Sequence, residues 1–280
     1  MHLILTIIKK IKDTVKKFYT IMALVMMLCI GCEWHLKPNS EDSDGNIVVE
    51  RYDRVQSLYL TTGDFAALQQ MSTNYPNQTR TLIEDVLKIG HVNDPEINSK
   101  FLHFYQDTIL QAIINEAEQQ YANMDDINKD FTQAFARLKS MMPGVEVPEV
   151  YAQIGSLDQS IIVGENSIGF SLDKYLGKDY PLYAKYYPEQ QRKMMVRQMI
   201  VPDCLLFYIL SIYPLPHNSR LTQQQCDLHM GKIQWVVNRI VGRRVFGNKY
   251  VATVARYMKR HAKTSFHDLI TMPIENDLSN

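Results

Sequence analysis

The sequence lacks the residue patterns that most often carry catalytic or metal-binding chemistry. Its 280 residues include four cysteines and eight histidines, but no spacing of these residues indicates a metal site, and the His-Glu-x-x-His pair of zinc peptidases is absent. A Walker loop, a Gly-x-Gly-x-x-Gly turn and a Gly-x-Ser-x-Gly elbow are missing as well. We therefore expect no catalytic residue, no metal and no cofactor, and we predict that the protein is not an enzyme.

An excess of charge of one sign is also missing. Lysine and arginine together number 30, as do aspartate and glutamate. Residues 1–31 hold five lysines and one aspartate, so the remainder of the chain has 25 basic and 29 acidic residues and a net charge of −4. A mildly acidic domain does not present the basic surface that nucleic acid requires. Nucleic-acid binding is therefore excluded, whereas the 46% of apolar residues fits an ordinary globular domain.

The apolar run near the amino terminus is too short to cross a membrane comfortably. It extends over residues 21–30 and follows five lysines between Lys9 and Lys17, whereas a spanning helix needs about 20 apolar residues. A basic stretch followed by a short apolar run is typical of a secretion signal. We therefore predict that residues 1–31 are a signal peptide.

Cys32 is the predicted site of lipid attachment. The run Leu28-Cys29-Ile30-Gly31-Cys32 resembles the bacterial lipobox, although Cys29 stands where leucine is usual. The resemblance implies diacylation of Cys32 and cleavage before it. Residues 32–46 are polar and are predicted to form a flexible tether. The alternatives are an uncleaved signal anchor and a plainly secreted protein.

Two cysteines remain in the predicted domain. Cys204 and Cys226 both lie in apolar helical patterns, where a free thiol behaves as a small buried hydrophobe. The oxidising envelope also permits a disulfide between them. We favour two buried thiols, with the disulfide as the alternative.

Helices are predicted over most of residues 47–270, the expected globular domain. The pattern Asp94-Pro95-Glu96 begins the longest predicted helix, which should reach Tyr121. A second helix from Asp125-Asp126 to Met142 should pair with it, and the helix dipole explains the two carboxylates at its start. Further helices are expected over residues 64–71, 77–89, 189–200, 202–213, 222–240 and 251–261. Residues 271–280 are expected to be frayed.

Short strands are predicted in the middle of the chain. Residues 147–154, 160–163 and 168–172 are apolar runs separated by Gly, Asp, Asn and Ser, and Gly164–Ser167 is a plausible hairpin turn. The fold class is therefore α+β: a mostly helical single domain with a small antiparallel sheet of about three strands.

A tyrosine-rich loop over residues 173–188 is the candidate partner-binding site. Tyrosine offers a large contact area and a polar tip at low entropic cost, so Asp173, Tyr175, Tyr180 and Tyr183 are the candidate residues; the alternative is that the loop packs onto its own domain. Basic side chains form two further patches. Solvated helix surface is their expected role, with contact to anionic headgroups or an acidic partner as the alternative. The patches comprise Arg192, Lys193 and Arg197, and Arg239, Arg243 and Arg244.

The run Gly-x-x-Leu-Asp-x-Tyr-Leu-Gly from Gly169 to Gly177 resembles the core of the GldB family of gliding-motility lipoproteins from the Bacteroidetes. The similarity covers most of residues 48–240 and fades after Arg243. It is also seen in Val49–Tyr59, Val147–Tyr151, Gln198–Leu206 and Met230–Val237. This resemblance implies a membrane-anchored protein required for gliding or associated with type IX secretion, with no established catalytic activity.

The order of strands and helices also resembles zinc-peptidase-like domains. The corresponding helix, Lys193 to Ile200, has Arg197-Gln198 and no histidine, which implies a degenerate scaffold without its metal. We expect a lipoprotein of the inner or outer membrane that binds other envelope proteins without catalysis. The alternatives are a hydrolase-like envelope enzyme or a ligand-binding protein that uses the loop from Asp173 to Tyr187.

Overall fold

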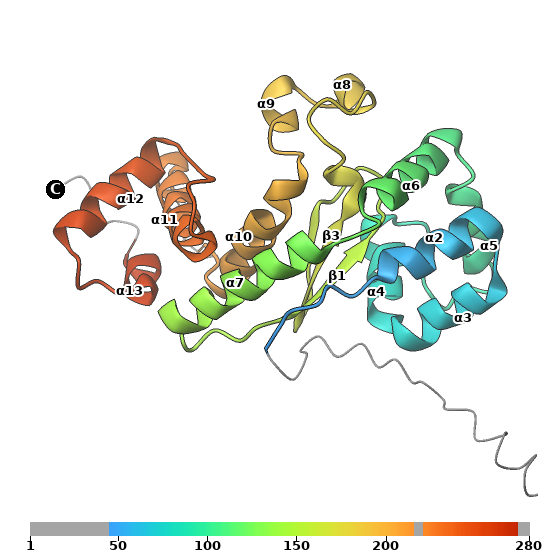
Figure 1. Cartoon of the computed structure of the whole chain (residues 1–280), viewed down its shortest axis with the longest axis horizontal. Coiled ribbons are helices and arrows are strands. Elements are labelled where there is room, and N and C mark those ends of the chain that lie inside the picture. Colours follow the sequence, from blue (N-terminus) through green and yellow to red (C-terminus); the bar gives the residue numbers. More distant parts are fainter. Residues whose placement is uncertain (1–44, 216–220, 274–280) are drawn as a thin grey trace, which may run out of the picture. The chain divides into compact units, whose positions relative to one another are not determined.

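The computed structural model describes residues 45–215 and 221–273, and these form a mostly helical α+β domain with a small sheet (Figure 1). Cys32 and nearly all of the predicted tether lie outside the described residues, as does most of the predicted frayed tail. Gly45 and Asn46 are exposed, and Ile47 is the first buried residue. No helix in the described ranges is long and apolar enough to cross a membrane.

The domain begins with a segment that runs beside the sheet. Glu50 pairs in parallel with Tyr151: its amide donates to Val150 O at 2.8 Å, and its carbonyl accepts from Ala152 N at 2.9 Å. Helix α2 (Tyr52–Thr62) follows directly. This helix was not among those predicted from the sequence, and it ends at Gly63, whose φ of +71° suits a glycine.

The helix predicted from Asp94 to Tyr121 is broken, which corrects that prediction. Helix α5 (Ile97–Phe104) ends at Tyr105, and α6 (Thr108–Gln120) begins after Asp107. Asp107 accepts hydrogen bonds from Ile109 N and Leu110 N, as an N-cap does. The longest described helix is instead α11 (Gln223–Val241). The remaining helices before the sheet are α3 (Phe65–Asn74), α4 (Pro76–Thr81) with the π-helical turn η1 (Leu82–Val86), and α7 (Asp125–Met141).

The sheet is mixed and not antiparallel as predicted. Its strands are β1 (Glu149–Gln153), β2 (Ile161–Val163) and β3 (Ser167–Ser171), in the order β1-β3-β2. The hairpin predicted between β2 and β3 is confirmed, because Gly164 N donates to Ser167 O at 2.8 Å. Strand β1 lies on the other side of β3 and runs parallel to it. Strands β1 and β2 follow one another in the sequence, but β3 lies between them in the sheet.

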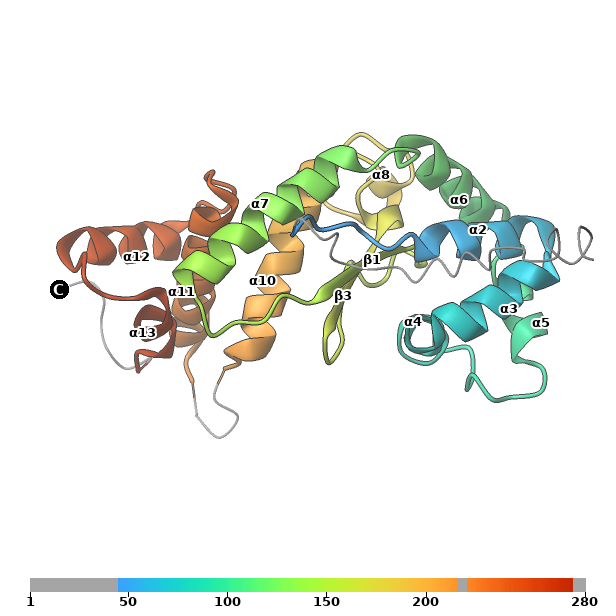
Figure 2. The same ribbon diagram turned by 60° about the horizontal axis from the view of Figure 1, so that its bottom comes forward.

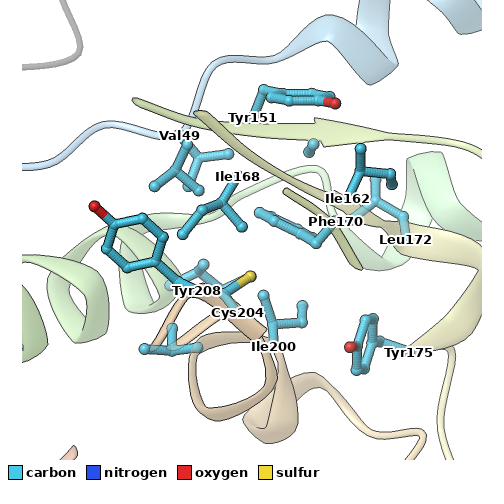
Figure 3. Packing of buried hydrophobic residues seen from close by; sticks show 14 of the residues in the cluster. Val49, Tyr151, Ile162, Ile168, Phe170, Leu172, Tyr175, Ile200, Cys204 and Tyr208 are labelled. Atoms are coloured by element: carbon cyan, nitrogen blue, oxygen red, sulfur yellow. The ribbon is translucent and has the colours of Figure 1, made fainter. Parts of the chain in front are cut away.

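Both faces of the sheet are covered by helices. Figure 3 shows Ile168 and Phe170 of β3 pointing towards Ile200 and Cys204, with Tyr151 on the opposite face. Ile200 and Cys204 belong to helix α10 (Ile200–Ile212), which covers the face of the sheet that carries Ile168 and Phe170. Both of these β3 side chains are fully buried. Two aromatic contacts extend the packing, one on each face. The ring of Phe170 lies 6.2 Å from that of Phe131 on α7, and the ring of Tyr151 lies 6.4 Å from that of Tyr52 on α2.

Three helices at the carboxyl end extend the domain: the first packs onto α10 and α7, and the other two pack onto the first (Figure 2). They are α11, α12 (Lys249–Arg260) and α13 (Phe266–Thr271). The sequence did not predict α13. Lys232 lies fully buried on α11 and donates to Met272 O at 2.9 Å, and Trp235 meets Phe266 edge to face, so α13 is held against α11.

The helix predicted from Glu189 to Ile200 is also not continuous. Helix α9 (Glu189–Arg192) is short, and a 3₁₀ turn, η3 (Arg197–Met199), leads into α10 at Ile200. The likeness to zinc-peptidase-like domains depended on a helix from Lys193 to Ile200, which is not formed. The two cysteines are free: Cys204 is buried as predicted, whereas Cys226 is only partly buried.

Candidate functional site

A groove of about 990 Å³ lies where the tyrosine-rich loop meets α6. One wall is α6, another is the loop after β3, and the third is the segment before α10. Figures 1 and 2 show α6 and α8 (Tyr183–Tyr186) at the same end of the sheet. The apolar side chains of the groove belong to Ile109, Tyr175, Leu176, Tyr180, Leu182 and Val196, and the charged ones to Glu116, Lys178, Asp179, Lys185 and Arg197.

Asp173 holds the base of this loop. It lies in the 3₁₀ turn η2 (Leu172–Lys174) at the end of β3, and its carboxylate accepts hydrogen bonds from Gly155 N at 2.6 Å and Leu157 N at 2.7 Å. The side chain is fully buried, and burial raises the pKa of its carboxyl group above the usual value. Leu157 has a φ of +66°. The carboxylate therefore stabilises a sharply turned backbone and does not reach the groove.

Three tyrosines fix the loop from Asp173 to Tyr183. Tyr183 donates from its hydroxyl to Asp173 O, and the same hydroxyl accepts from Leu176 N at 2.9 Å. Tyr175 donates to Asp203 Oδ2 on α10 at 2.9 Å, and its ring lies near Ile200 in Figure 3. Tyr121, at the end of α6, donates to Tyr175 O at 2.7 Å. The loop is thus tied to both α6 and α10.

Lys174 and α6 add further ties. Lys174 is buried, and its Nζ donates to Leu157 O at 3.0 Å and to the Tyr187 hydroxyl at 3.1 Å. Gln120 on α6 donates from Nε2 to Leu176 O at 3.0 Å. Polar side chains therefore satisfy the loop backbone at several points and hold this wall of the groove in place.

Arg197 supports the third wall of the groove. It forms a two-pronged ion pair with Asp126, with Nη2–Oδ1 and Nε–Oδ2 distances of 2.6 and 2.8 Å, and donates to Gln120 O and Asn123 O. The guanidinium also lies over the ring of Tyr121. Arg197 holds the pKa of Asp126 below its usual range. The Asp126 carboxylate at the start of α7 therefore links α7 to the turn η3. Its position is also favourable for the helix dipole.

The predicted site residues divide into a buried group and one surface residue. Asp173, Tyr175 and Tyr183 are buried. For these three residues the loop packs onto its own domain, which was the alternative to partner binding. Tyr180 is only partly buried and lines the groove. Sequence reasoning missed Ile109, whose side chain is 41% exposed within an otherwise regular apolar pattern. Val196 could not be assigned to the groove from the sequence, because a continuous helix was expected at that position.

No group of three or more potential metal ligands comes together in the part of the chain that the structure describes. His229 is buried, and its ring Nε2 lies 2.8 Å from Tyr213 O, within hydrogen-bond distance.

Comparison with known proteins finds one family, and the matched part of the chain contains the whole groove. The family described as gliding motility protein GldB matches residues 33–244, which begin directly after Cys32 and include every groove residue. No curated protein and no solved structure matches the chain. The resemblance of the Gly169–Gly177 run is therefore confirmed over most of the sequence: the chain belongs to the GldB family of gliding-motility lipoproteins.

Proposed function

We propose that this protein is a lipid-anchored, non-enzymatic binding or assembly component of the cell envelope, and that the groove beside α6 binds a segment of another envelope protein. The observation that carries the proposal is the use of Asp173, Tyr175 and Tyr183. The polar groups of all three hold the groove wall, so the loop supplies a fixed surface and these three residues are not free to react.

The chemistry of the groove favours a peptide segment with apolar and charged side chains. Ile109 and Tyr180 contribute apolar area to the groove, whereas Glu116, Lys178 and Lys185 contribute charges of both signs. Protein interfaces commonly combine apolar area with polar and charged groups. A preformed surface also binds at lower entropic cost, because few side chains must be ordered on association.

The anchor at Cys32 supports this role by location. A lipid-attached domain remains near envelope partners, and membership of a lipoprotein family agrees with a residence in the cell envelope. Labelling of cells with a radioactive lipid precursor tests the attachment. Wild-type protein should incorporate label and the Cys32→Ala variant should not; equal incorporation would show that Cys32 is not the site.

Photo-crosslinking from groove positions in native membranes tests the binding role. A photoreactive amino acid at Ile109 or Tyr180 should give a discrete adduct with an envelope protein. Phe65 on α3 is the matched control, because it is apolar and 73% exposed but lies outside the groove. Identical adducts from Phe65 and Ile109, or no adduct from the groove positions, would contradict the proposal. Hydrolysis of peptidoglycan fragments by the purified protein would contradict its non-enzymatic part.

A further inference from the structure

A second cavity, of about 620 Å³, lies between α7, α11 and α12 and is lined by five arginines. They are Arg137 from α7, Arg239 near the end of α11, Arg243 and Arg244 in the loop that follows, and Arg256 from α12. Among the residues that the structure describes, no acidic one lines the cavity. The apolar residues of its lining are Met141, Trp235, Val251, Ala252 and Ala255.

Most of this positive charge is not neutralised within the domain. In residues 45–215 and 221–273, Arg243 alone among the five forms an ion pair, with 3.5 Å between its Nη1 and Asp130 Oδ2. Arg137 and Arg256 donate to neutral oxygens, Ile240 O and Thr253 Oγ1, both at 3.1 Å. Like charges repel across a shared cavity, and a bound anion would relieve that repulsion.

The arginines are held in place by the surrounding backbone. Gly242 ends α11 with a φ of +74°, and a Cβ there would lie 3.0 Å from Nη1 of Arg137, so the guanidinium packs directly on this glycine. Asn238 fixes the loop that carries Arg243 and Arg244. Its side chain accepts from Val245 N and Phe246 N and donates to Phe246 O.

We propose that this cavity binds a phosphate ester with an apolar portion. Guanidinium groups bind phosphate with two parallel hydrogen bonds, and several can share one phosphate. Trp235 is partly exposed at the cavity and offers an aromatic surface to the apolar portion. A lipid headgroup and a soluble phosphate ester share this chemistry. The cavity is separate from the groove beside α6, because no residue lines both.

Trp235 provides a direct readout of binding. The chain has two tryptophans, so the full-length Trp34→Phe variant, purified in a non-ionic detergent, reports fluorescence from Trp235 alone. Phenyl phosphate should change this fluorescence in a saturable manner, whereas phenol, which has no charge, should not. Dihexanoyl-phosphatidylglycerol is the lipid probe, with dihexanoyl-phosphatidylcholine as its zwitterionic counterpart. Tighter binding of the phosphatidylglycerol identifies a lipid headgroup, and tighter binding of phenyl phosphate identifies a soluble ester.

Two double variants with the same loss of charge test the role of the arginines. Arg239→Gln with Arg244→Gln should raise the Kd for phenyl phosphate at least about tenfold, because two phosphate contacts are lost. Lys259→Gln with Arg260→Gln on α12 removes two exposed charges outside the cavity and should change the Kd less than about twofold. If the first variant loses the wild-type circular dichroism, Ala255→Phe takes its place, since it fills the cavity without altering charge and should weaken binding similarly.

Three results would overturn the proposal. The first is the absence of a saturable change with either phosphate probe. The second is equal affinity for phenyl phosphate and phenol. The third is an equal Kd in the cavity variant and in the control variant on α12.

Discussion

Replacing Asp173 by alanine should destabilise the domain strongly. The carboxylate is fully buried and accepts from two backbone amides, Gly155 N and Leu157 N. Without an acceptor, a buried amide costs about 1–3 kcal/mol, and the partly buried Leu157 amide costs less. The substitution should therefore lower the free energy of unfolding by about 2–4 kcal/mol, which is a large part of the 5–15 kcal/mol typical of a domain. Asp173→Asn retains one carbonyl acceptor and should cost about half as much.

Urea unfolding of the full-length protein, followed by far-ultraviolet circular dichroism, measures these differences. Asp179 is the matched control, because it lies in the same loop but its side chain is 86% exposed. Asp179→Ala should change the free energy of unfolding by less than about 0.5 kcal/mol. If Asp173→Ala falls within about 1 kcal/mol of Asp179→Ala, the two hydrogen bonds do not hold the loop as described.

Three further substitutions test the sheet, the break in the α5–α6 region and a buried acid. Gly169→Ala should cost about 1–3 kcal/mol of unfolding free energy, because a Cβ there would lie 2.3 Å from Cζ of Tyr151. Asp107→Ala should cost about 1 kcal/mol through loss of the α6 N-cap. Burial raises the pKa of Asp203 to about 7, so the folded state holds this proton after the unfolded chain has lost it, and the contribution of Asp203 to stability falls as pH rises from about 4 to about 7. Asp203→Asn should therefore match the wild type at about pH 4 and be more stable at about pH 8, by up to roughly 4 kcal/mol.

Controls for these substitutions use the same urea assay. Gly144→Ala has open space around the new methyl group and should be nearly neutral, so an equal cost at both glycines would argue against the contact with Tyr151. For Asp107, Asp107→Ser retains a capping oxygen and should recover most of the loss. A difference between Asp203→Asn and wild type that does not change with pH would show that Asp203 has an ordinary pKa in the folded protein.

The regular parts of the fold follow from local patterns. Helix α7 was predicted from apolar residues at helical spacing after two acids, and it extends from Asp125 to Met141. The hairpin at Gly164 was predicted from turn residues between two short apolar runs. In each of these elements the residues that specify the structure lie within a few positions of one another. Neighbouring side chains then determine the backbone conformation without distant contacts.

The break between α5 and α6 could not be predicted from local patterns. Ile97, Phe101, Tyr105 and Ile113 continue one helical pattern and are buried. However, Tyr105 donates from its hydroxyl to Ile154 O and Gly155 O, residues far along the chain. Together with the Asp107 cap, this tertiary contact favours two helices over one, and periodicity alone carries no information about it.

By itself, the sequence determined the family, through the Gly169–Gly177 run, and the mostly helical α+β class, through the spacing of apolar residues. It also singled out Asp173, Tyr175 and Tyr183. Only the tertiary structure decided what these residues do, because burial and hydrogen-bond partners depend on chain segments distant in sequence. In the folded domain their polar groups satisfy backbone atoms and Asp203 on α10. The surface to which we assign the proposed binding role therefore lies around them, at Ile109 and Tyr180.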